Sequence, residues 1–73
     1  MSQNYHFSVS LSAQKTQSIY QGRVKYLLVT TDQGLKLQLP AARFRSFVSA
    51  EGIQGRFQVE VDEKNRLKRL VKI

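Results

Sequence analysis

The chain has 73 residues, with 12 Lys and Arg against 5 Asp and Glu, a formal net charge of +7 and no cysteine. This length makes one small basic domain over residues 1–73, and its 41% hydrophobic residues are too many for a disordered chain. The lack of cysteine excludes a disulfide framework and a zinc ribbon, and we find neither a signal peptide nor a membrane span. We therefore expect a cytoplasmic protein.

The first predicted strand covers residues 5–11, where an apolar residue stands at every second position: Tyr5, Phe7, Val9 and Leu11. This alternation is typical of a strand with one buried face. Ser12 then fits a helix N-cap, and residues 13–20 predict a helix of barely two turns that Gly22 ends. A helix this short is stable only when it packs against the sheet.

A second strand is predicted over residues 23–31, with apolar side chains on both faces, so we expect both faces to be covered over part of its length. Residues 31–34 supply turn chemistry, because Asp32 can bond its own backbone and Gly34 tolerates positive φ. A hairpin into a third strand over residues 35–39 follows.

Pro40 ends the third strand and suits the first position of a helical turn over residues 41–47. Residues 53–61 alternate cleanly and predict a fourth strand, in which Gly55 indicates a bulge or a close approach of another segment. A turn follows with Asn65 at positive φ, and residues 67–73 predict the fifth strand.

The predicted order is strand, short helix, two strands, helical turn and two strands. Short connections favour antiparallel pairing of neighbouring strands. We therefore expect an α+β, mainly β fold: five antiparallel strands in one bent sheet or a small, partly open barrel. No repeat or linker divides the chain.

Several segments together resemble a known family. They are Tyr20-Gln21-Gly22, Asp32-Gln33-Gly34, Leu39-Pro40-Ala41, Arg45-Ser46-Phe47-Val48, Gly52-Ile53-Gln54-Gly55-Arg56-Phe57 and Asn65-Arg66-Leu67. In them the chain resembles a domain-of-unknown-function family of short, uncharacterised gammaproteobacterial proteins, from about Tyr5 to Ile73. The resemblance implies a stand-alone cytoplasmic protein and brings no established activity.

Catalytic and metal chemistry find little support in the residues. His6 lies on the polar face of the first strand with no nucleophile suggested nearby, and Asp62 and Glu63 sit adjacent in a turn. The stretch from Gly52 to Gly55 precedes a strand instead of a helix, so it is not a phosphate-binding loop. We expect no enzyme activity, no cofactor and no metal site.

The basic residues carry the remaining hypothesis. If the strands are neighbours, their outer faces form a cationic surface for the phosphates of RNA or DNA: Arg23, Lys25, Lys36, Arg56 and Lys68. The four phenylalanines fall on inward positions, whereas Tyr20 and Tyr26 are candidates for exposed stacking. We expect a non-enzymatic nucleic-acid-binding accessory protein. The alternative is a small protein-interaction module that uses a strand edge or the groove beside the Pro40 turn. A merely solubilising charged surface also stays open.

Overall fold

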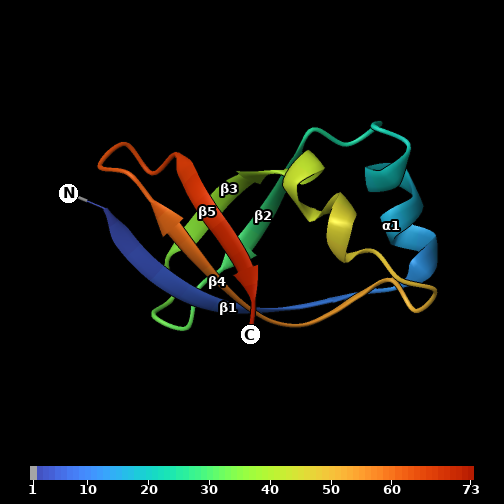
Figure 1. The fold of residues 1–73 in the computed structure, drawn as a ribbon, viewed down its shortest axis with the longest axis horizontal. Helices are drawn as coiled ribbons and strands as arrows, with labels where there is room; N and C mark the ends of the chain where they lie inside the picture. Colours follow the sequence, from blue (N-terminus) through green and yellow to red (C-terminus); the bar gives the residue numbers. More distant parts are fainter. Residues whose placement is uncertain (1) are drawn as a thin grey trace.

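The computed structural model describes residues 2–73, which form five strands and two helices (Figure 1). In chain order the elements are β1 (Gln3–Leu11), α1 (Ala13–Tyr20), β2 (Tyr26–Thr30), β3 (Lys36–Pro40), the 3₁₀ helix η1 (Ala41–Phe47), β4 (Ile53–Val61) and β5 (Leu67–Lys72). All strand pairs are antiparallel. The prediction of a mainly β fold with antiparallel pairing is therefore confirmed.

The strands form two sheets, so the prediction of one five-stranded sheet is wrong. One sheet has the order β1-β4-β5 and the other is the β2-β3 hairpin, and the two do not close into a barrel. The hairpins β2-β3 and β4-β5 pair because a tight turn fixes their register. No such turn joins β1 to β2, because α1 and the loop of residues 21–25 lie between them.

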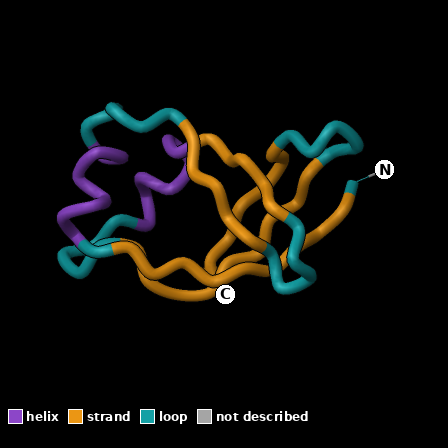
Figure 2. Tube along the Cα trace, turned by 180° about the vertical axis from the view of Figure 1, so that it is seen from behind, coloured by secondary structure: helices purple, strands orange, loops and turns teal. Residues whose placement is uncertain are grey.

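Both helices lie at one end of the molecule, away from the N-terminus (Figure 2). Ser12 caps α1 as predicted, since its hydroxyl accepts a hydrogen bond from the backbone N–H of Lys15 at 3.3 Å. Thr16 and Ile19 are the buried side chains of α1, which packs beside η1. The predicted helical turn after Pro40 is this 3₁₀ helix, and Phe44 is its fully buried anchor.

The core lies between the three-stranded sheet, the hairpin and η1. Three rings with no exposed surface form its centre, one each from β1, η1 and β4: Phe7, Phe44 and Phe57. Phe7 stacks on Phe57 with ring centroids 5.8 Å apart, and Phe44 meets Phe57 edge-on at 5.8 Å. Phe47 is only half-buried but also meets Phe57 edge-on, so all four phenylalanines face inward as predicted.

The second strand differs from its prediction in length and in burial. It begins at Tyr26 instead of Arg23, and only the face with Leu27 and Val29 turns toward the core. On the other face Leu28 is 67% exposed and Tyr26 is 55% exposed, so the expected cover on both faces is wrong. The core, with Phe44 of η1, holds Val29 of the inner face, and the side chains of the outer face stay exposed.

Two local predictions near β4 can be placed. Asn65 has φ 62° in the turn between β4 and β5, as expected. Gly55 marks a close approach, because a Cβ there would lie 2.8 Å from Cε of Lys72. The irregularity in the β4–β5 pairing falls at Glu60 and Val61 instead of Gly55.

Candidate nucleic-acid interface

The six residues predicted to bind nucleic acid do not lie together. Arg23 and Lys25 are in the loop after α1, and Tyr26 begins β2, so these three share one end of the molecule. Lys36 begins β3, Arg56 lies on β4 and Lys68 on β5. The strands β4 and β5 belong to the other sheet, so neither pairs with the hairpin strand that carries Lys36.

Arg56 is held by a carboxylate. Its Nη1 donates to Asp32 Oδ1 at 2.9 Å and to Ser8 Oγ at 3.0 Å, while its Nη2 pairs with Asp32 Oδ2. This hydrogen-bonded pairing lowers the pKa of Asp32 and raises the pKa of Arg56. The guanidinium keeps its charge, but its Nη1 and Nη2 groups already bond oxygens of Asp32 and Ser8.

Lys68 is also near a carboxylate, with its Nζ 3.9 Å from Glu60 Oε2. Lys36 is exposed on the outer face of the hairpin, opposite Thr30. Neither strand carries a second residue from the set predicted to bind nucleic acid. These two positions therefore add charge to the molecule without forming a local cluster with Arg23 and Lys25.

Four exposed cations stand on two adjoining segments, the α1–β2 loop and η1. We call this region the basic end, and its members are Arg23, Lys25, Arg43 and Arg45. The loop and η1 are joined by a hydrogen bond of 2.9 Å from the Ala41 N–H to the Lys25 carbonyl. None of the four cations forms an ion pair with another residue in 2–73. Neither α1, η1 nor the loop before β2 contains Asp or Glu, and the acids closest to them in the sequence are Asp32 in the hairpin turn and Glu51.

The backbone fixes the loop that carries Arg23. The Ser18 carbonyl, in the last turn of α1, accepts hydrogen bonds from Arg23 N–H at 2.9 Å and Val24 N–H at 3.3 Å. Gly22 directly precedes Arg23 and has φ 78°, where a side chain would be strained. The helix end therefore determines where the loop presents its cations.

Two exposed tyrosine rings accompany the basic end. Tyr20, the last residue of α1, is 59% exposed, and the Arg45 guanidinium carbon lies 5.2 Å from its ring centroid. This is a cation–π contact between α1 and η1. Tyr26 follows Lys25 directly and is similarly exposed. Both tyrosines identified as stacking candidates are thus accessible, and one is held in place by an arginine.

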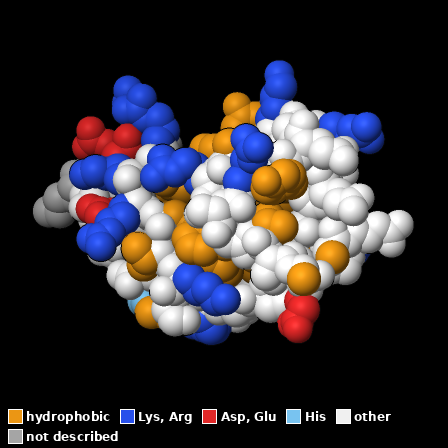
Figure 3. Space-filling view, turned by 45° about the vertical axis from the view of Figure 1, so that its right-hand side comes forward, with side chains coloured by type: hydrophobic (Ala, Val, Ile, Leu, Met, Phe, Trp, Pro, Cys, Tyr) orange, Lys and Arg blue, Asp and Glu red, His pale blue; other side chains and the backbone are white. Residues whose placement is uncertain are grey.

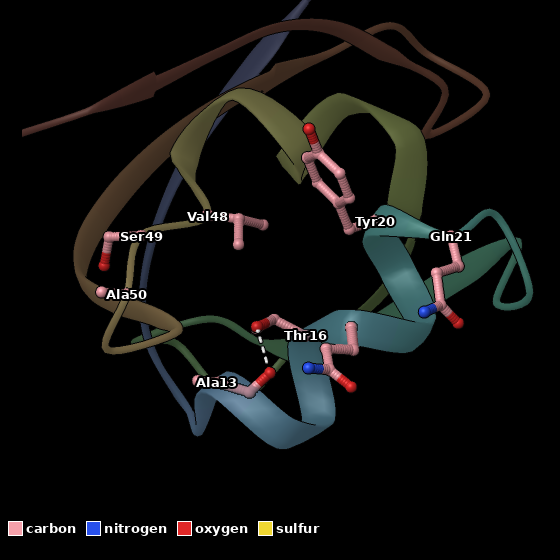
Figure 4. A pocket seen from close by; sticks show the side chains of 8 residues that line it. Ala13, Thr16, Tyr20, Gln21, Val48, Ser49 and Ala50 are labelled. Atoms are coloured by element: carbon pink, nitrogen blue, oxygen red, sulfur yellow. Dashed lines mark hydrogen bonds between the residues drawn. The ribbon is translucent and has the colours of Figure 1, made fainter.

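A groove of about 460 Å³ runs between α1 and the segment after η1 (Figure 4). Tyr20 stands on its rim, Thr16 lies on the helix side, and Val48 faces them from the opposite wall. The Thr16 hydroxyl already donates to the Ala13 carbonyl at 2.9 Å. Because this hydroxyl is already bonded, the free polar groups of the lining include the side-chain amides of Gln17, on α1, and Gln21, directly after it. Ala13, Val48 and Ala50 make the rest of the lining largely apolar.

Figure 3 turns the end with α1 and η1 forward. Lys and Arg side chains surround a central area of exposed hydrophobic side chains, and Asp and Glu appear only toward the edges of this face. A cationic surface with an apolar centre is suited to a ligand that has both negative charge and flat apolar groups.

Sequence reasoning found Arg23, Lys25 and Tyr26 of this site but not Arg43 and Arg45. Arg45 contacts Tyr20, a contact between η1 and α1 that depends on how the two helices pack. The signal available in the sequence was the absence of acidic residues from 33 to 50, which alone does not say what η1 packs against.

No three His, Asp or Glu side chains gather as a metal site within residues 2–73. No helix in the same range is long and apolar enough to cross a membrane.

Comparison with known proteins identifies the family. A family described as "Protein of unknown function (DUF2835)" matches residues 3–73, which is nearly the whole chain. No curated protein and no solved structure matches the chain. The resemblance seen in the sequence is confirmed by this match, and the chain belongs to the DUF2835 family of proteins of unknown function.

Proposed function

We propose that the protein binds single-stranded nucleic acid at the basic end, as a non-enzymatic accessory protein of the cytoplasm. The observation that carries the proposal is the combination of four cations without ion-pair partners in residues 2–73 and two exposed tyrosines on α1, η1 and the loop before β2, none of which contains an acidic residue. Arg23, Lys25 and Arg43 contact backbone phosphates. The proposal assigns no catalytic residue and no cofactor.

The tyrosines favour a single strand over a duplex. A ring can stack on a base only when that base is not already stacked and paired, and such stacking stabilises binding by about 1–3 kcal/mol per base. Tyr20 is on the rim of a groove whose volume of about 460 Å³ has room for a base. Arg45 lies over the same ring, with its guanidinium carbon 5.2 Å from the ring centroid.

Only three of the six residues that the sequence predicted to bind nucleic acid lie in the proposed interface. Arg23, Lys25 and Tyr26 stay in the interface. Arg56 has its guanidinium engaged with Asp32 and Ser8, and Lys68 lies near Glu60, so both contribute only to the long-range field. Lys36 contributes in the same way, from the hairpin.

The test is fluorescence anisotropy with labelled single-stranded RNA, single-stranded DNA and both duplexes, at low and at physiological salt. We expect saturable binding to the single strands that weakens steeply with salt. The double variant Arg23→Ala/Arg43→Ala should lose at least about tenfold in affinity, because two phosphate contacts are removed.

The matched control is Lys36→Ala/Lys64→Ala, which removes the same charge from exposed positions outside the basic end. It should weaken binding by less than about threefold. Equal losses in the two double variants would mean that net charge alone causes binding and that the assigned interface is wrong. No binding to any of the four nucleic acids at low salt would overturn the whole proposal.

A second candidate function, binding of a partner protein, is favoured by a different observation. The facing edges of β1 and β2 are not paired with each other, and Leu28 beside them is exposed. This surface is separate from the groove beside Tyr20, so the two functions do not exclude one another.

A further inference from the structure

The edges of β1 and β2 face each other but do not form a ladder. The Asp32 N–H donates to the His6 carbonyl at 2.8 Å and closes one end of the gap. Beyond this bond β1 pairs only with β4, and β2 only with β3. The two strands therefore leave an open seam between the sheets.

The register of the hairpin shows which backbone groups of β2 point into the seam. Ala41 N–H bonds the Lys25 carbonyl and Thr31 N–H bonds the Leu35 carbonyl, so the odd-numbered residues of β2 make the ladder with β3. The N–H and C=O groups of the residues between them point away from β3. Pro40, which has no N–H, stands opposite Tyr26 at a position that needs none.

On β1 the even-numbered residues point into the seam. Because the His6 carbonyl points to Asp32, the backbone groups of Ser8 and Ser10 also point away from β4. Continuing antiparallel from the His6–Asp32 bond, Ser10 falls opposite Leu28. Backbone donors and acceptors of both strands are thus open to a further strand.

Side chains make the seam partly apolar. A groove of about 310 Å³ is lined by residues 8–11 of β1 and residues 27–30 of β2. Leu11 and Leu27 are half-buried in it, and Leu28 is 67% exposed beside it. An extended segment placed here would meet both backbone groups and apolar surface.

We propose that an extended, acidic segment of a partner protein adds as a strand to the free edge of β2. The charges around the seam specify its chemistry, because Lys25 precedes β2, Lys36 stands opposite Thr30, and Arg56 donates to Ser8 Oγ. The nearby carboxylate, Asp32, is already paired with Arg56. A second copy of the chain carries the same +7 charge and is repelled.

Strand addition of this kind gains affinity from main-chain hydrogen bonds and specificity from alternate side chains. Every second residue of the segment is apolar and faces the groove at Leu27, while the residues between are acidic and face Lys25 and Lys36. The inference does not rest on nucleic-acid binding at the basic end, since it uses the backbone edge of β2 and another ligand; Lys25, directly before β2, is the one residue that both surfaces share.

The test uses a short synthetic peptide of alternating valine and glutamate, compared with one of alternating valine and lysine. Amide hydrogen exchange of the isotope-labelled protein is measured with each. The glutamate peptide should slow exchange of the Leu28 N–H at least about tenfold, because that N–H gains an acceptor, whereas the Val29 N–H is already bonded within the hairpin and should change little. The lysine peptide should leave both unchanged.

Two variants at one position separate the backbone from the side chain. Leu28→Pro removes the N–H that faces the seam and leaves the β2–β3 ladder intact, so peptide affinity should fall at least about tenfold. Leu28→Ala keeps that N–H, and it should reduce affinity less. Unchanged exchange at Leu28 with saturating glutamate peptide overturns the proposal, even if the proline variant fails to fold. Slowing of Leu28 exchange by single-stranded RNA alone would also overturn it.

Discussion

Arg56 connects three segments that the chain order keeps far apart. From β4 its guanidinium reaches Ser8 on β1 and Asp32 in the turn of the β2–β3 hairpin. Asp32 also donates its backbone N–H to the His6 carbonyl. This exposed arginine therefore tethers the hairpin to the three-stranded sheet, which its alternating position on the strand does not reveal.

The tether predicts a dependence of stability on pH. The hydrogen-bonded Arg56 lowers the pKa of Asp32 below its ordinary value of 3.8, so ionised Asp32 stabilises the folded state. Asp32→Asn should lower the free energy of unfolding at neutral pH. The difference from the wild type should persist above 3.8 and shrink as pH falls through the folded-state pKa. Urea denaturation at a series of pH values measures it.

Glu51→Gln is the control, because Glu51 is exposed and forms no ion pair in the described chain. Its free energy of unfolding should follow the wild type across the series. A constant difference between wild type and Asp32→Asn down to the lowest pH would show that the carboxylate's charge is not what stabilises the fold.

At the scale of elements, the loop before β4 fits against the start of α1. Gly52 is buried with φ 96°, and a Cβ there would lie 2.0 Å from the Leu11 carbonyl oxygen and 2.6 Å from the Ser12 carbonyl carbon. Those atoms are backbone and cannot rotate away. This close approach fixes the loop before β4 against the Ser12 cap, at the start of α1. It therefore also fixes how far α1 lies from Val48 across the groove.

Gly52→Ala should therefore lower the free energy of unfolding by more than about 2 kcal/mol, from the strained φ together with the backbone clash. Gly22→Ala is the matched control, since its φ is 78° but nothing lies within 4 Å of the new Cβ. It should cost about 1 kcal/mol, from the strain alone. Equal costs in chemical denaturation would show that the contact with residues 11 and 12 is unimportant.

For the whole molecule, local patterns predicted the elements but not their assembly. Alternation located β1 and β4, and turn residues located both hairpins, because these signals act between near neighbours in the chain. The pairing of β1 with β4 joins segments about forty residues apart and has no local signal. The split into two sheets followed from that pairing, so it could not be predicted.

The candidate site divides in the same way. Tyr26 and the two cations before it could be found, since they flank a recognisable strand. The contact of Arg45 with Tyr20 depends on how η1 packs beside α1, and the engagement of Arg56 depends on where Asp32 lies. Charge composition indicates that a basic surface exists. Only tertiary packing decides which cations stay available.

The unpaired edge of β2 has a consequence for how copies of the protein meet. An open strand edge is a template for self-association, and here the +7 charge keeps copies apart at low ionic strength. Salt screens that repulsion over roughly 10 Å at 0.1 M. Sedimentation should therefore show self-association that grows with salt, whereas association that stays constant or falls would contradict this. Repulsion between the positive charges thus protects the open edge of β2 from pairing with another copy. A polyanion that neutralised this charge would remove the repulsion and allow copies to approach each other.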